Sequence, residues 1–235
     1  MANVCILLAP MRNGTSVLMY ALSSHPEIFQ MAGLIEQTAK KSTNWPQTEE
    51  YGGQRVQILV DMYIPLMEAI AGKDVSNDQT EGELARQHSL QNLVVIDRTH
   101  IPMDERFWRR LADTDFKVMS IFRHPAEVAL SYLSWQEKHG VDPEALMQKW
   151  VSAVDAYHFL KDTNDTLLLK HEDICGDPES QGRRIFDWLG VSPNAKFASY
   201  YQKASQKRQK DSRWQTLITD EVTRAAESIG YAPLV

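Results

Sequence analysis

The sequence predicts an α/β fold in which helices flank a central parallel sheet of about four to five strands. Short apolar segments alternate with segments whose apolar residues follow helical spacing, and Gly or Pro residues separate many of them. Strands of a sheet covered on both faces are buried on both sides, which accounts for continuous apolar runs. The 235 residues suffice for one well-packed core, so we expect a single domain over residues 1–235.

Composition and charge narrow the class of protein. Hydrophobic residues make up 43% and charged residues 24% of the chain, as in ordinary soluble proteins. The formal net charge of -6 argues against a nucleic-acid partner, because backbone binding draws on clustered Lys and Arg. The first apolar run, residues 4–9, is too short for a signal peptide or a membrane span, and Cys5 and Cys175 lack metal-ligand spacing. We therefore expect reduced thiols in a cytoplasmic protein without a membrane partner.

The first half of the chain begins with a strand, a loop and a helix. Residues 4–9 form the expected strand, and a helix is expected from about Thr15 to Ser24. His25-Pro26 ends this helix, and Ile28 to Met31 suits a short extended segment. Residues 38–91 are polar and mixed except for one stretch with apolar residues at helical spacing, Arg55 to Ala71. We expect a lid or insertion there.

The second half is more regular. Strands are expected at Leu93 to Ile96, Phe116 to Phe122 and Thr166 to Leu169. Pro residues open several of the intervening helices and Gly residues close two of them. The expected helices run over about Asp104 to Leu111, Pro125 to His139, Pro143 to Leu160, Pro178 to Leu189 and Ile218 to Tyr231. Ligands of such folds bind outside the carboxyl ends of the strands, where the polar residues Arg98 to His100 and Arg123-His124 follow apolar runs.

The loop from Ala9 to Thr15 has the properties of an anion site. A helix that begins after Gly14 aims the N–H groups of Asn13 to Ser16 and the positive end of its dipole at one point, and Arg12 adds a charge. These features suit a phosphate group. An ordinary strand-helix turn, in which Gly and Thr simply suit the turn and cap, is the alternative.

Three segments carry a resemblance to a known family. Pro10 to Ser16 resembles the 5′-phosphosulfate loop of sulfotransferases that use 3′-phosphoadenosine 5′-phosphosulfate (PAPS). Ile121 to Tyr132 is similar to their 3′-phosphate motif, in which an Arg and a Ser eight residues later hold the second phosphate. His171-Glu172-Asp173, with Asp177 to Glu179 downstream, is similar to a further segment of that family, and the three matches occur in the family's order.

The resemblance implies a P-loop-like nucleotide site and a sulfonyl transfer from PAPS to a hydroxyl or amine acceptor. The product would be adenosine 3′,5′-bisphosphate (PAP), and no metal is implied. The acceptor would be a small molecule, or a hydroxyl of a glycan or peptide, held in part by the insertion at 38–91. The implied nucleotide-binding residues are Arg12, Asn13, Gly14, Thr15, Ser16, Val17, Arg123 and Ser131, together with Arg208 and Lys210 from a basic segment that matches the family loosely.

The same resemblance points to catalytic residues. Arg98-Thr99-His100-Ile101-Pro102 is similar to the Lys-Thr-His-Leu-Pro segment of cytosolic-type sulfotransferases, whose His removes the acceptor proton. His100 is therefore the expected general base, since a His holds a neutral nitrogen near pH 7. A structural His that caps the next helix is the alternative, and Glu36 is the rival base by analogy with the tyrosylprotein branch. Arg12 is expected to stabilise the leaving phosphate.

Each assignment has an alternative from elementary chemistry. Arg12 can be a surface arginine, Arg123 can form a salt bridge with a nearby acid, and Ser131 can bond back to the carbonyl of Glu127. A second hypothesis for the first loop is that it binds ATP in a kinase or another phosphotransferase. It is disfavoured because no Gly-x-x-x-x-Gly-Lys-Ser/Thr pattern and no evident Mg²⁺-binding acid accompany that loop. A non-catalytic nucleotide-binding protein is a third.

Overall fold

The computed structural model describes residues 3–31, 94–99, 105–202 and 212–232, together with Pro65. The predictions for the insertion at 38–91, for the alternative bases His100 and Glu36, and for Arg208 and Lys210 lie outside the described residues.

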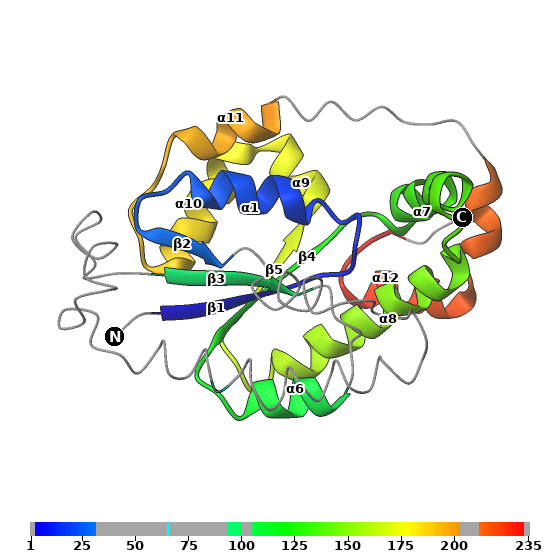
Figure 1. The fold of residues 1–235 in the computed structure, drawn as a ribbon, viewed down its shortest axis with the longest axis horizontal. Helices are drawn as coiled ribbons and strands as arrows, with labels where there is room; N and C mark the ends of the chain where they lie inside the picture. The colour runs from blue at the N-terminus through cyan, green and yellow to red at the C-terminus, as the bar shows by residue number, and fades with distance from the viewer. Residues whose placement is uncertain (1–2, 32–64, 66–93, 100–104, 203–211, 233–235) are drawn as a thin grey trace, which may run out of the picture.

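The sheet has five parallel strands in the order β2-β3-β1-β4-β5, which confirms the predicted fold class (Figure 1). The apolar runs form its centre, and every side chain from Val4 to Leu8 is buried. The strands are β1 (Asn3–Leu8), β2 (Ile28–Met31), β3 (Val94–Thr99), β4 (Lys117–Phe122) and β5 (Thr166–Lys170).

The third predicted strand is longer than its apolar run indicates. The sequence suggested an end at Ile96, but Asp97, Arg98 and Thr99 continue the pairing of β3 with Ile6 to Leu8 of β1. Parallel pairing uses backbone N–H and C=O groups, so polar side chains at a strand end do not interrupt it. The prediction of that boundary was wrong for this reason.

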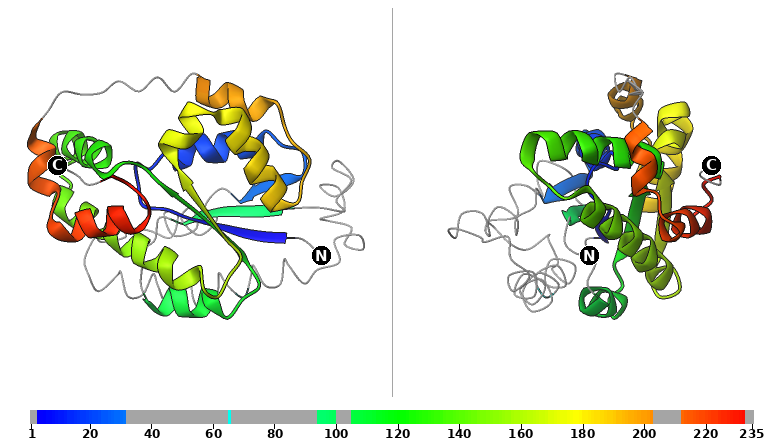
Figure 2. Two further views of the ribbon diagram at one scale, coloured as in Figure 1. Left: turned by 180° about the vertical axis from the view of Figure 1, so that it is seen from behind. Right: turned by 90° about the vertical axis from the view of Figure 1, so that its right-hand side faces the viewer.

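Helices cover both faces of the sheet (Figures 1 and 2). One face carries α1 (Thr15–Ser23), α9 (His171–Gly176), α10 (Pro178–Leu189) and α11 (Lys196–Gln202). The other carries α6 (Glu105–Ala112), α8 (Pro143–Leu160) and α12 (Asp220–Ser228). Helix α7 (Pro125–His139) and the 3₁₀ segment η2 (Ser212–Leu217) lie beyond the carboxyl ends of the strands. Among the described residues, buried apolar side chains fill the space between these layers and the sheet.

The predicted and observed helix boundaries agree best where a Pro in the first turn or a capping side chain marks the start of the helix. Pro125, Pro143 and Pro178 each open a helix at the first turn, as predicted, and the side chains of Asp142 and Asp177 cap two of them. The last helix is shorter than the predicted Ile218 to Tyr231. The short elements α9, α11 and η2 were not predicted, because six or seven residues carry too little periodicity to be recognised.

Strand register brings four strand ends to one edge. Leu8 of β1 pairs with Thr99 of β3 and with Ser120 of β4, and Phe122 of β4 pairs with Lys170 of β5. The polar residues that follow these strands therefore meet at the carboxyl edge of the sheet, as expected for a ligand site of this fold class.

Neither Cys5 nor Cys175 forms a disulfide, in agreement with the sequence prediction of reduced thiols. Burial raises the pKa of Cys5 to about 12, so this thiol stays protonated and packs as a small apolar side chain. Among the helices that the structure describes, none combines the length and apolar character that a membrane crossing requires.

Candidate functional site at the carboxyl edge of the sheet

The first loop follows β1 and has an unusual backbone. Gly14 caps α1 with φ of 85°, and Arg12 has φ of 68°, the left-handed region that side chains other than Gly rarely adopt. The N–H groups of the first turn of α1 have no acceptor within the helix, and they add to the positive end of its dipole. Such a turn favours an anion in front of it.

The side chain of Asn13 joins this loop to the segment Phe122 to Glu127, which we call the β4–α7 corner. Asn13 is fully buried, and its Nδ2 donates to the carbonyl oxygens of Pro10 and Met11 at 3.2 and 2.9 Å. Its Oδ1 accepts the backbone N–H of Arg123 at 2.7 Å and the indole N–H of Trp150 at 3.2 Å. The carboxamide is thus satisfied by protein groups, and its role is to hold the two segments together.

Helix α7 holds Arg12 through neutral groups. Arg12 Nε donates to Ser131 Oγ at 2.8 Å, and the guanidinium carbon lies 5.0 Å from the centroid of the Trp135 ring. The hydroxyl of Tyr132 donates to the carbonyl oxygen of Met11 at 2.9 Å. Arg12 is exposed and its partners there carry no charge, so its positive charge remains available to an anion. The Ser131 hydroxyl proton remains available as well, since this hydroxyl accepts from Arg12.

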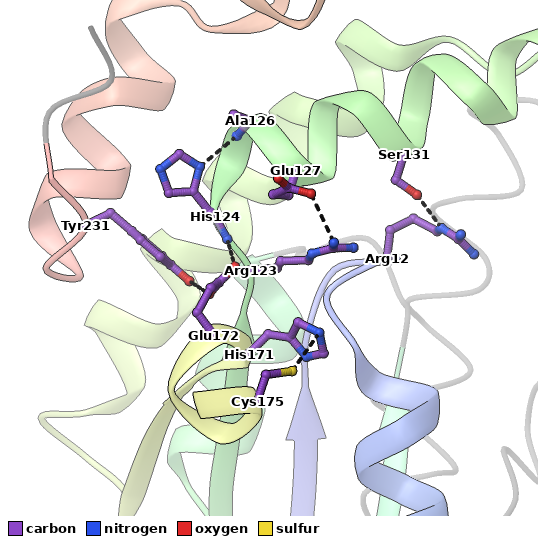
Figure 3. A network of polar contacts seen from close by, with 10 residues as sticks. All are labelled: Arg12, Arg123, His124, Ala126, Glu127, Ser131, His171, Glu172, Cys175 and Tyr231. Atoms are coloured by element: carbon purple, nitrogen blue, oxygen red, sulfur yellow. Dashed lines mark hydrogen bonds and ion pairs between the residues drawn. The ribbon is translucent and has the colours of Figure 1, made fainter. Parts of the chain in front are cut away.

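Arg123 has a charged partner instead. Its Nη2 lies 3.1 Å from Glu127 Oε2, and the two side chains are about three-quarters buried. The alternative of a salt bridge to a nearby acid is therefore realised for Arg123. For Ser131 the geometry differs from the alternative of a bond to the Glu127 carbonyl, because its hydroxyl oxygen accepts from Arg12 Nε. Figure 3 shows both guanidinium groups beneath α7, against Glu127 and Ser131.

The other side of the corner is held by Glu172. Its Oε1 accepts the backbone N–H of His124 at 2.8 Å, and its Oε2 accepts the hydroxyl of Tyr231 at 3.0 Å (Figure 3). His124 caps α7, where its Nδ1 accepts the N–H of Ala126 at 3.3 Å. The first loop and α9 thus hydrogen-bond to the β4–α7 corner, and Tyr231 is joined to it through Glu172.

His171 lies under the first loop. A Cβ atom on Gly14 would stand 2.4 Å from His171 Nδ1, so the ring packs directly against the Gly14 backbone. His171 is buried, its Nε2 is 3.5 Å from Cys175 Sγ, and its Nδ1 has no hydrogen-bond partner among the described residues. Burial, and next the positive charge of Arg123, lower the pKa of His171, while Glu172 opposes the shift. The ring is therefore neutral near pH 7.

The structure brings the described part of the predicted site to one edge. Arg12 and Ser131 are in contact, and Arg123 is joined to the first loop through Asn13. Thr99, the residue before the predicted base His100, ends β3 beside Leu8 at the same edge. Within the described residues, no group of three or more His, Cys, Asp or Glu could hold a metal ion.

Several residues that organise the site were not predicted. Tyr132 and Trp135 are next to Ser131 or one helical turn from it, which is a signal that helical spacing offers. Glu172 lies in a segment already noted for its resemblance, though no role had been assigned to it. Trp150 and Tyr231 reach the site only through the packing of α8 and of the turn after α12, and sequence spacing gives no indication of this.

The fold and the edge together define the class: a three-layer α/β protein with a phosphate-loop-like first turn and two arginines at the carboxyl ends of its strands. The family model of the sulfotransferase domain matches residues 3–229. The chain therefore belongs to the sulfotransferase domain family, and sulfonyl transfer is its general activity.

Solved structures of sulfotransferases share the fold. The chain is similar to the sulfotransferase domain from the curacin biosynthetic pathway, with a TM-score of 0.61, 16% identity, and coverage of 100% of this chain and 99% of that one. The sulfotransferase domain from the Synechococcus PCC 7002 olefin synthase gives a TM-score of 0.59 at 17% identity, with 99% and 95% of the two chains covered. Mouse sulfotransferase SULT7A1, solved in complex with PAP, gives 0.51 at 13% identity, covering 97% and 82%. No match is found among curated proteins.

Proposed function

We propose that the chain transfers the sulfonyl group of PAPS to a hydroxyl or amine acceptor and releases PAP. The observation that carries the proposal is the pairing of two cationic positions by Asn13, whose side chain bonds to the Arg12 loop and to the Arg123 backbone. A donor with a 5′-phosphosulfate and a separate 3′-phosphate requires two such positions. The PAP complex of the mouse sulfotransferase, which shares the fold, supports this choice of nucleotide.

The residues of the first loop fit the 5′ end of that nucleotide. The first turn of α1, with Gly14, Thr15, Ser16 and Val17, offers backbone N–H groups to the phosphosulfate. Arg12, in the same loop, rests on Ser131 and Trp135 of α7, and neither of these partners compensates its charge. As the bond between sulfur and the bridging oxygen breaks, negative charge grows on that oxygen, and a preorganised guanidinium stabilises it.

The β4–α7 corner fits the 3′-phosphate. Arg123 can exchange its ion pair with Glu127 for a bidentate contact with a phosphate, and the Ser131 hydroxyl can donate a second bond. Arg208 and Lys210 are proposed as further contacts, by family resemblance alone.

The acceptor side rests on His100. In an in-line transfer the acceptor oxygen or nitrogen forms a bond to sulfur on the side opposite to the leaving phosphate, and its proton passes to the base. We assign that proton to His100, which follows the strand end at Thr99, with Glu36 as the rival. The acceptor is proposed to be a small molecule, glycan or peptide. A radiolabelled-PAPS transfer assay should show turnover lost in His100→Ala and kept in Glu36→Ala; the reverse would make Glu36 the base.

Calorimetric titration tests the nucleotide assignment. The wild-type protein should bind PAP on the order of 100-fold more tightly than adenosine 5′-monophosphate, because only PAP engages Arg123. Arg123→Ala should remove most of that preference. Arg109→Ala is the matched control, since Arg109 also forms an i,i+4 pair with a Glu but is exposed on α6. Equal affinities of the wild-type protein for the two nucleotides would refute the two-phosphate site.

A further inference from the structure

Arg123 is fixed through the two peptide groups that flank its Cα atom. Its own N–H donates to Asn13 Oδ1 at 2.7 Å, and the next N–H, of His124, donates to Glu172 Oε1 at 2.8 Å. These two donors lie past the end of β4, where the sheet no longer provides acceptors. The direction in which Arg123 leaves the backbone therefore depends on Asn13 on one side and Glu172 on the other.

The Glu172 carboxylate is oriented in turn by Tyr231. Each carboxylate oxygen has one donor from a different segment, His124 N–H on Oε1 and Tyr231 O–H on Oε2. Burial and the neighbouring Glu172 raise the pKa of Tyr231 above its usual value, so the phenol remains a donor at neutral pH. Without that donor the carboxylate is free to rotate about its last bond, and its alignment with the His124 N–H is relaxed.

Tyr231 itself is held firmly. It is 9% exposed, and its ring stands edge-on to the His124 ring with centroids 5.5 Å apart. Lys170 Nζ lies 4.8 Å from the centroid of the Tyr231 ring and donates to the carbonyl oxygen of Gly230. Through Lys170 the turn that follows α12 is thereby attached to the end of β5. Figure 3 shows its other attachment, that of Tyr231 to the β4–α7 corner.

We propose that Tyr231 is a positioning residue for the nucleotide 3′-phosphate, acting through Glu172 and the His124 N–H on the direction of Arg123. This inference rests on the proposed function, in which Arg123 binds that phosphate. It gives the turn after α12 a role in donor selection, although Tyr231 lies 108 residues beyond Arg123 in the sequence. The hydroxyl of Tyr231 orients the Glu172 carboxylate, and the ring packs against its neighbours.

Tyr231→Phe separates the two contributions, because it removes the hydroxyl and keeps the ring. We expect about fivefold weaker binding of PAP by calorimetry, and unchanged binding of adenosine 5′-monophosphate, which lacks the 3′-phosphate. A general loss of structure would weaken both nucleotides alike. Tyr200→Phe, which removes a hydroxyl from an exposed tyrosine on α11, is the matched control and should bind both as the wild type does.

A double-mutant cycle with Arg123→Ala completes the test. If Tyr231 acts through Arg123, Tyr231→Phe should have no further effect on PAP binding once Arg123 is removed. An unchanged PAP affinity in Tyr231→Phe, an equal loss for both nucleotides, or full additivity with Arg123→Ala would each overturn the positioning role. Failure of the proposed function is distinct, because the wild-type protein itself would then show no preference for PAP.

Discussion

The first loop and the β4–α7 corner both present an arginine at the same edge, but they hold it in opposite ways. Arg12 has a left-handed backbone conformation, and its described partners are a neutral hydroxyl and an aromatic ring. Arg123 has its backbone anchored on both sides and its charge paired with Glu127. A positive φ at a residue other than Gly costs of the order of 1 kcal/mol, which the contacts with α7 must offset.

The difference bears on how each arginine meets an anion. Arg12 does not have to leave a carboxylate before it binds an anion. Its electrostatic attraction can therefore act in full on a group whose negative charge grows during the reaction. Arg123 must give up a carboxylate before it accepts a phosphate. Binding there is therefore a competition between two anions, which suits a residue that selects a nucleotide more than one that acts in the chemical step.

The largest expected effect concerns the backbone of the first loop. Gly14→Ala should lower the free energy of unfolding by about 2 to 4 kcal/mol and abolish PAP binding, because a Cβ atom there meets His171 Nδ1 and the left-handed conformation is itself strained. Gly140→Ala is the control: it has φ of 65° but open space around the Cβ position, and should cost about 1 kcal/mol. Urea unfolding measures both. Equal losses would mean that contact with His171 is unimportant.

A smaller effect on stability is expected from His171, which packs against Gly14 of the first loop and is influenced by the charge of Arg123 in the β4–α7 corner. Its pKa in the folded protein is lowered from 6.5, so the unfolded chain binds more protons once the pH falls below that value. The contribution of the neutral His171 to the free energy of unfolding is then fully present above about pH 6.5. It decreases on acidification, by about 1 kcal/mol between pH 7.5 and 5.5. Urea unfolding across this range should show a shallower decrease for His171→Gln.

His158 has to be separated from this effect, because burial and Lys161 lower its pKa as well. His158→Gln should remove its own part of the pH dependence and leave that of His171. A wild-type slope retained in His171→Gln would contradict the assignment.

The smallest effect tests the competition at Arg123. Glu127→Gln removes the anionic partner and should tighten PAP binding about threefold, with adenosine 5′-monophosphate unaffected. Glu105→Gln breaks the exposed pair with Arg109 on α6 and should change neither affinity. Weaker PAP binding in Glu127→Gln would show that Glu127 orients Arg123 for the phosphate and does not compete with it.

The sequence predicted the elements of the site whose signals are local. The loop from Pro10 to Ser16 combines Gly, Thr and a cation directly after an apolar run, and Arg123-His124-Pro125 marks a strand end followed by a helix start. Side-chain partners were predicted less well. The sequence assigned Arg123 to a phosphate, with a salt bridge to a nearby acid only as the alternative, and it gave no indication that Ser131 would face Arg12.

By itself, therefore, the sequence determined the parallel α/β sheet, the order of its strands and longer helices in the described part of the chain, and the residue types at the strand ends. These depend on periodicity, Pro and Gly positions and apolar content within a few residues. Only the tertiary structure decided that Asn13 would be buried between the two regions, and that Trp150, Glu172 and Tyr231 would reach the β4–α7 corner. Such contacts depend on how the helices pack against the sheet. The spacing of residues within one segment does not determine which residues of distant segments come into contact.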